Sequence, residues 1–140
     1  MKLSNVIVLF ILCLNIFSCK KKEETMPTPV PTITISKPGN SISATPDQNI
    51  LFEFTCNAVT KPDKLVGISE VNGVMNTRRE FLNKGMSSTT SVDNYTDTRT
   101  IKNIVESNVL LKAGDKVELT YTFYDKNGQT ATTKIQVTII

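Results

Sequence analysis

The sequence predicts an all-β fold, a two-sheet antiparallel β-sandwich of about seven strands in residues 32–140. Apolar residues in this part of the chain recur at every second position, which is the spacing of a strand with one buried face. Turn-forming residues separate these alternating runs at short intervals, and no helical pattern of comparable length follows residue 31. An apolar content of 39% is enough for one modest core.

Residues 1–18 have the layout of a secretory signal peptide. Lys2 supplies positive charge, and Val6–Phe17 is an apolar run interrupted only by Asn15. About a dozen residues are too few to span a bilayer core, which needs roughly 20, but they suit the core of a signal peptide. The run ends in Ile16–Cys19, with the sequence IFSC, which resembles the lipobox of bacterial lipoproteins.

The lipobox resemblance implies cleavage before Cys19 and lipid on its thiol, so that the mature chain is anchored to the outer membrane of a bacterium. An ordinary signal peptide followed by a chance cysteine is the alternative. The charged run Lys20–Glu24 resembles the export signal of surface lipoproteins in Bacteroidota, which implies exposure at the cell surface; a solvated linker is the other interpretation. Three prolines within residues 27–31 favour an extended tether.

The chain is therefore expected to comprise a signal peptide (residues 1–18), a lipidated tether (19–31) and one domain (32–140). The net charge of +3 lies mainly before the domain, because residues 32–140 contain 12 Lys and Arg against 11 Asp and Glu. A nearly neutral domain gives no reason to expect nucleic-acid binding. Cys56 is the remaining free thiol of the mature chain, which excludes an internal disulfide.

The first two strands of the domain are expected at Thr32–Ser36 and Ile50–Ala58. The turn residues Lys37–Asn40 end the first of them. In the second strand Cys56 shares its face with two phenylalanines. We therefore expect Cys56 to be a small buried core residue rather than a nucleophile.

The middle of the domain is less regular. The pair Asn72-Gly73 suits the φ > 0 positions of a tight hairpin turn. Thr100–Val105 is expected to be a strand, although its apolar spacing also fits a helix. The other expected elements are a loop at Thr60–Lys64, a strand at Leu65–Val71, a strand at Arg78–Leu82, a turn at Asn83–Gly85 and a strand at Thr89–Tyr95.

The C-terminal region predicts a β-hairpin with one buried face. Alternation is strongest in Val117–Tyr124, and it returns in Lys134–Ile139 after the short loop Asp125–Gly128. The segments Gly114–Thr122, Tyr124–Gln129 and Thr133–Thr138 resemble the end of bacterial immunoglobulin-like (Ig-like) and PKD-like modules, in which a GD-x-V-x-L strand and a D-x-x-G hairpin lead to the last strand.

This resemblance covers the chain from Gly114 onward and implies an Ig-like sandwich, with no activity attached to it. The chain has no Trp and its domain has a single Cys, so it lacks the tryptophan and disulfide that pin antibody domains. Aromatic side chains of the alternating strands are expected to fill the core instead.

The residue types give little support for catalysis. The chain has no histidine, which removes the commonest general base and the Ser-His-Asp and Cys-His arrangements. Asp93 and Asp97 are expected in a polar loop, where carboxylate oxygens could hold a hard cation. A solvated loop is the simpler interpretation. We expect no catalytic residue, no cofactor and no metal.

The leading hypothesis is a non-catalytic, surface-anchored Ig-like module that binds or scaffolds an envelope protein or a glycan. The loops Thr60–Lys64, Asn83–Ser88 and Asp125–Gln129 are the expected contact regions, because loops at the ends of sandwiches commonly carry binding. One alternative is a surface hydrolase or metal-dependent enzyme that uses Asp93 and Asp97. Another is a small-ligand binder with a cleft between the sheets.

Overall fold

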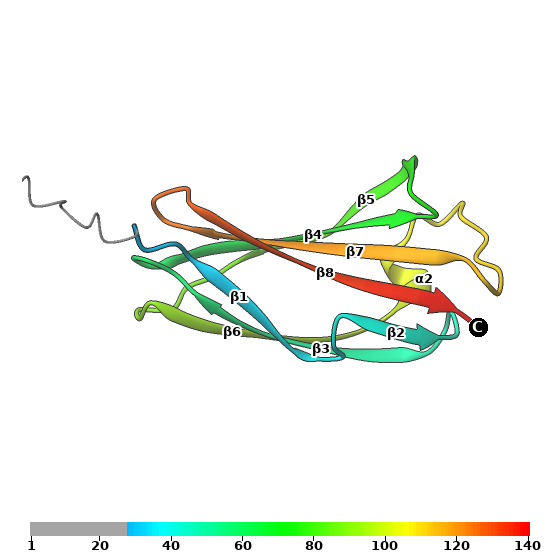
Figure 1. Ribbon diagram of the computed structural model, residues 1–140, viewed down its shortest axis with the longest axis horizontal. Coiled ribbons are helices and arrows are strands. Elements are labelled where there is room, and N and C mark those ends of the chain that lie inside the picture. The colour runs from blue at the N-terminus through cyan, green and yellow to red at the C-terminus, as the bar shows by residue number, and fades with distance from the viewer. Residues whose placement is uncertain (1–27) are drawn as a thin grey trace, which may run out of the picture.

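The computed structural model describes residues 28–140, apart from the side chains of residues 75–77. It is an Ig-like β-sandwich in which two sheets face each other across one apolar core (Figure 1). Eight strands and one short helix make up this part of the chain, so the predicted fold class is confirmed. Within residues 28–140 no helix is long and apolar enough to cross a membrane.

The smaller sheet has three antiparallel strands in the order β1-β3-β6. Its members are β1 (Thr32–Lys37), β3 (Asn49–Asn57) and β6 (Val92–Thr100). β1 and β3 lie within one residue of their predicted bounds. Their ladder begins with Thr32 opposite Asn57, which places the start of β1 at the end of β3.

The larger sheet has five strands in the order β2-β8-β7-β4-β5. β2 runs parallel to β8, and the other neighbours are antiparallel. Because β1 belongs to one sheet and β2 to the other, the chain crosses between the sheets after Lys37. The five members are β2 (Ser41–Ala44), β4 (Pro62–Val71), β5 (Val74–Gly85), β7 (Lys116–Asp125) and β8 (Thr130–Ile139).

The alternation along β3 and β7 fills the core with aromatic rings. Tyr121 is only 1% exposed and lies among three phenylalanines. Its ring centroid is 4.4 Å from that of Phe54, 6.0 Å from that of Phe52 and 5.5 Å from that of Phe81. Tilted and edge-on contacts at these distances are favourable for aromatic rings. The predicted buried face of the C-terminal hairpin is confirmed.

A glycine in β4 makes room for one of these rings. A Cβ on Gly67 would lie 2.7 Å from Phe81 Cζ and 3.1 Å from Leu82 Cβ. The ladder between β4 and β5 shifts register just after this residue. Phe81 then reaches Tyr121 edge-on across the position that a side chain at residue 67 would need. The close approach therefore requires a residue without a Cβ.

The predicted strand at Thr100–Val105 is wrong, because residues 101–104 form the short helix α2 (Ile101–Ile104). Thr100 caps its start, and Thr100 Oγ1 accepts a hydrogen bond from Asn103 N at 3.3 Å. Two donors from the larger sheet bind the last carbonyls: Ser69 Oγ donates to Ile104 O at 3.0 Å, and Arg79 Nη1 donates to Val105 O. The apolar spacing of residues 100–105 fits both a strand and a helix, and these tertiary contacts favour the helix.

Other element predictions also need correction. The turn expected at Asn83–Gly85 is wrong, because these residues continue β5 and pair with β4. The loop expected at Thr60–Lys64 ends earlier, since β4 begins at Pro62, and β6 begins at Val92 rather than Thr89. β2 was not expected at all. The Asn72-Gly73 turn is confirmed, with φ angles of 52° and 67°.

Candidate functional site

The three predicted contact loops lie together at the end of the sandwich where β1 begins (Figure 1). We call this the near end; it contains the connections 58–61, 86–91 and 126–129. Backbone hydrogen bonds tie the connections to the sheets and to one another: Lys126 N donates to Lys61 O at 2.9 Å, and Met86 N donates to Asp63 O at 2.8 Å. Of the predicted regions, Pro62–Lys64 and Asn83–Gly85 are strand rather than loop.

Several side chains at the near end hold its turns, whereas two buried oxygens, Asp125 Oδ2 and Gln129 Oε1, have no hydrogen-bond partner within residues 28–140. Asp125 is 1% exposed, and its Oδ1 accepts hydrogen bonds from Asn127 N and Gln129 N, both at 2.9 Å. Lys126 forms an ion pair with Asp63 of β4. The turn after β7 is therefore built as a structural unit, with its charged groups directed to neighbours in the same chain.

The opposite end of the sandwich carries exposed apolar side chains. Figure 1 shows α2, the end of β2 and the C-terminus gathered there. Leu110 is 79% exposed, the largest exposed fraction among the large apolar side chains that the structure describes. It borders a hollow of about 220 Å³. We call the lining of this hollow the far-end patch; it consists of Pro46, Asp47, Lys102, Val109, Leu110 and Leu111.

The far-end patch is assembled from three separate segments. Lys102 N of α2 donates to Pro46 O in the β2–β3 connection at 3.0 Å. The connection 105–115 contributes Leu110, and it is fixed near its end by Gly114 N, which donates to Ile139 O at 2.8 Å. This patch was not predicted from the sequence. The available signal was a run of three apolar residues, 109–111, that does not alternate and lies between turns.

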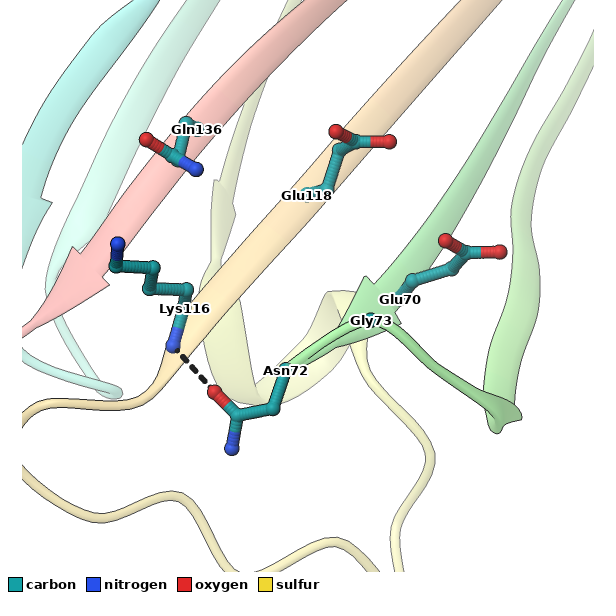
Figure 2. Close-up of a pocket in the computed structure, with 6 residues that line it drawn as sticks. All are labelled: Glu70, Asn72, Gly73, Lys116, Glu118 and Gln136. Atoms are coloured by element: carbon teal, nitrogen blue, oxygen red, sulfur yellow. Dashed lines mark hydrogen bonds between the residues drawn. The ribbon is translucent and has the colours of Figure 1, made fainter.

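A second candidate is a shallow polar depression on the outer face of the five-stranded sheet (Figure 2). Asn72 Oδ1 accepts a hydrogen bond from Lys116 N at 2.8 Å, which holds the β4–β5 turn to the start of β7. Glu118 pairs with Lys134 at 2.6 Å. These contacts explain the depression as a structural junction. It has a volume of about 370 Å³ and is lined by Glu70, Asn72, Gly73, Lys116, Glu118 and Gln136.

Asp93 and Asp97 lie in β6, so the polar loop expected at these residues is wrong. On an extended strand, residues four apart are separated by roughly 13 Å, which is too far for both carboxylates to hold one cation. Asp97 Oδ2 instead accepts a hydrogen bond from Tyr95 Oη at 2.8 Å and pairs with Arg99. Across residues 28–140, no group of three or more His, Cys, Asp or Glu side chains is placed to hold a metal ion.

The contacts of Asp97 make its stabilising effect depend on pH. Partial burial raises the pKa of Asp97, but hydrogen bonds from Arg99 and Tyr95 lower it more, so that it lies below the ordinary value of 3.8. A carboxyl group with a lower pKa in the folded chain stabilises the fold above the ordinary pKa. That contribution is lost as the pH falls through the lowered pKa.

We therefore expect Asp97→Asn to reduce the free energy of unfolding by up to about 1 kcal/mol at about pH 6, since the ion pair is partly exposed. The difference from the wild-type chain should shrink at a pH below the lowered pKa of Asp97, where the wild-type carboxylate is also neutralised. Urea unfolding at the two pH values measures this. Asp47→Asn, at a carboxylate that is 77% exposed, is the control. A difference that is the same at both pH values would contradict the assignment.

The free thiol of the domain is a core residue, as predicted. Cys56 is fully buried between the sheets. Burial raises the pKa of its thiol to about 12, and the charge of Asp93 adds to this effect. Because the thiolate is the reactive form, a thiol with this pKa is inert at neutral pH.

No protein-family model and no curated protein matches the chain. Among solved structures, a superoxide reductase (neelaredoxin) from Ignicoccus hospitalis is similar, with a TM-score of 0.51 and 10% identity over 78% of this chain and 80% of that one. A Niemann-Pick type C2 protein from the Japanese carpenter ant has a TM-score of 0.48 and 14% identity, covering 81% of this chain and 95% of that one.

The CARDB domain of a Pyrococcus furiosus protein, solved in complex with di-metal ions, has a TM-score of 0.35 and 11% identity over 79% of this chain and 92% of that one. All three are small all-β domains. At 10% identity, the similarity to the superoxide reductase concerns the fold alone. That similarity supports a small all-β fold and carries no activity over to this chain.

Proposed function

We propose that this chain is a surface lipoprotein, anchored by lipid on Cys19, whose Ig-like domain is a non-catalytic module that binds an envelope protein. The observation that carries this proposal is the separation of the two ends of the sandwich. The chain enters β1 at the near end, and the far-end patch lies at the opposite end (Figure 1). An anchor that precedes β1 would therefore direct the far-end patch away from the membrane.

The chemistry of the far-end patch supports a protein partner rather than a glycan. Val109, Leu110 and Leu111 are aliphatic; Leu110 is 79% exposed, while Val109 and Leu111 are half-buried against the core. Asp47 and Lys102 form an exposed ion pair 3.5 Å apart at its border. An apolar centre with a charged rim is typical of protein contacts. Sugar sites more often offer aromatic faces, and the residues that line this hollow include no aromatic side chain.

A photo-crosslinking residue at Asn108 tests the proposal on intact cells that make the full chain. We expect one discrete protein adduct. Leu110→Asp should reduce that adduct at least about tenfold, because burying a leucine contributes about 1.5–3 kcal/mol and each 1.4 kcal/mol is a factor of ten in binding. Leu110 is exposed, so the substitution leaves the core intact.

Two controls make the result specific. Val92→Asp changes an exposed valine on β6, outside the patch, and should leave the adduct unchanged. The same crosslinker at Asn127 reports on the near end and should give no adduct. An adduct that survives Leu110→Asp, or that forms equally from Asn127, would argue against the far-end patch. An adduct containing only glycan would argue against a protein partner.

A further inference from the structure

β6 is an edge strand whose backbone groups can be assigned to its two sides. It pairs with β3 on one side, and no strand of the described chain lies on the other. Just before β6, Ala58 N donates to Ser91 O at 2.7 Å in the same register as the β3–β6 ladder. Bonded and non-bonded pairs alternate in an antiparallel ladder. The N–H and C=O groups of Val92, Asn94, Thr96 and Thr98 therefore point to the open side.

Side-chain oxygens of the same chain accept hydrogen bonds from most of these open-side N–H groups. Asn94 N donates to Asp93 Oδ1 at 2.9 Å, and Thr98 N donates to Asp97 Oδ1 at 2.8 Å. Val92 N is 3.4 Å from Thr90 Oγ1, which in turn donates to Val92 O at 2.9 Å. The two aspartates that were candidate cation ligands thus act on the backbone of their own strand.

The two oxygens of Asp97 have separate partners. Oδ2 accepts hydrogen bonds from Tyr95 Oη and from Arg99 Nε, while Oδ1 accepts the hydrogen bond from Thr98 N. Arg99 is itself fixed, because its Nη1 donates to Phe81 O of β5 at 2.9 Å. The hydrogen bond from Arg99 to Phe81 O of β5 therefore fixes Arg99, and Arg99 in turn holds the Asp97 carboxylate beside the open side of β6.

We propose that Asp93 and Asp97 close the β6 edge against strand pairing with a second copy of this chain. An edge strand with open donors is a template for another edge strand, and every copy presents the same β6 edge. The outward side chains of β6 are uncharged and rich in threonine, so they favour an extended strand and do not repel a copy. The carboxylates bind the donors that a second strand would need.

The test uses Thr96→Cys as a reporter in the full chain, with Cys13 and Cys19 both replaced by serine and with Cys56 left buried in the core. Thr96 lies at the middle of β6, where paired copies bring reporters close enough for a disulfide. We expect Asp93→Ala with Asp97→Ala to increase the disulfide-linked dimer about tenfold. Asp93→Asn, with Asp97 kept, should stay at the reporter level, because its amide oxygen accepts the same hydrogen bond from Asn94 N without the charge.

Hydrogen exchange of the peptide 92–100, followed by mass spectrometry, gives a second readout. Exchange should be faster in the alanine variant than in the asparagine variant when the chains are too dilute to pair. Asp93→Ala alone keeps the Asp97–Arg99 pair and serves if the double variant fails to fold. The proposal is overturned if folded alanine variants show no added dimer. It is equally overturned if the asparagine variant dimerises as much, or if the reporter chain alone is already fully dimeric.

Discussion

Tyr121→Ala is expected to lower the free energy of unfolding by about 3–5 kcal/mol, the usual cost of removing a large aromatic side chain from a core. Tyr121 is in contact with rings from β3 and β5, so its loss leaves a void shared by both sheets. A domain of this size has about 5–15 kcal/mol of stability in total, so this one substitution removes a large part of it. Urea unfolding followed by circular dichroism measures the change.

Two variants on the same strand sharpen that measurement. Tyr121→Phe keeps the ring and should cost less than about 1.5 kcal/mol. Tyr124→Ala removes a ring from the outer face of β7, where it lies 4.9 Å below the Lys64 ammonium, and its cost should also be small. If Tyr121→Ala and Tyr124→Ala destabilise equally, the aromatic cluster is not the centre of the core.

Cys19→Ala is expected to abolish incorporation of radiolabelled palmitate and to leave residues 1–18 attached to the chain. The reason is chemical: in the proposed lipobox the thioether to diacylglycerol would form on this thiol, and the cleavage before residue 19 would follow that step. Labelling in growing bacteria and the mass of the purified chain measure the two effects. Under the proposal the acyl chains on Cys19 hold the chain to the outer membrane, so the variant is also expected to lose that attachment.

The matched control is Cys13→Ala, which removes the other cysteine of the N-terminal segment. Cys13 lies within the proposed signal peptide, so its replacement should change neither the label nor the mass of the mature chain. Equal labelling of the wild-type chain and Cys19→Ala would contradict the lipobox interpretation. Cys56 is unsuitable as a control, since it is buried and its loss would disturb the core.

The strands that the sequence predicts well are those with one buried face. Val117–Tyr124 and Ile50–Ala58 alternate cleanly because every second side chain enters the core, and the structure places β7 and β3 there. β2 could not be predicted from alternation in this way. Its four residues supply two core-facing side chains, and its parallel pairing with β8 joins segments about ninety residues apart. No local pattern encodes such a contact.

The misplaced elements have two causes, a polar edge strand and contacts between distant segments. The strand predicted at Thr89–Tyr95 starts too early because β6 is an edge strand with polar residues on both faces, which hides its alternation. Thr100–Val105 fits two periodicities, and Ser69 and Arg79 from distant strands select the helix. The far-end patch could not be predicted as a unit, because its residues meet only after three segments have folded together.

The crossing of the chain from β1 to β2 has a mechanical consequence. If a partner holds the far-end patch while an anchor holds the chain before β1, the pull runs along the strand axes (Figure 1). The β1–β3 bonds are then loaded in shear, so that they must break together rather than one after another as in a zipper. The hydrogen bonds between β2 and β8 would resist the same pull in the other sheet. Tension applied through the tether would therefore meet resistance in both sheets before the core opens.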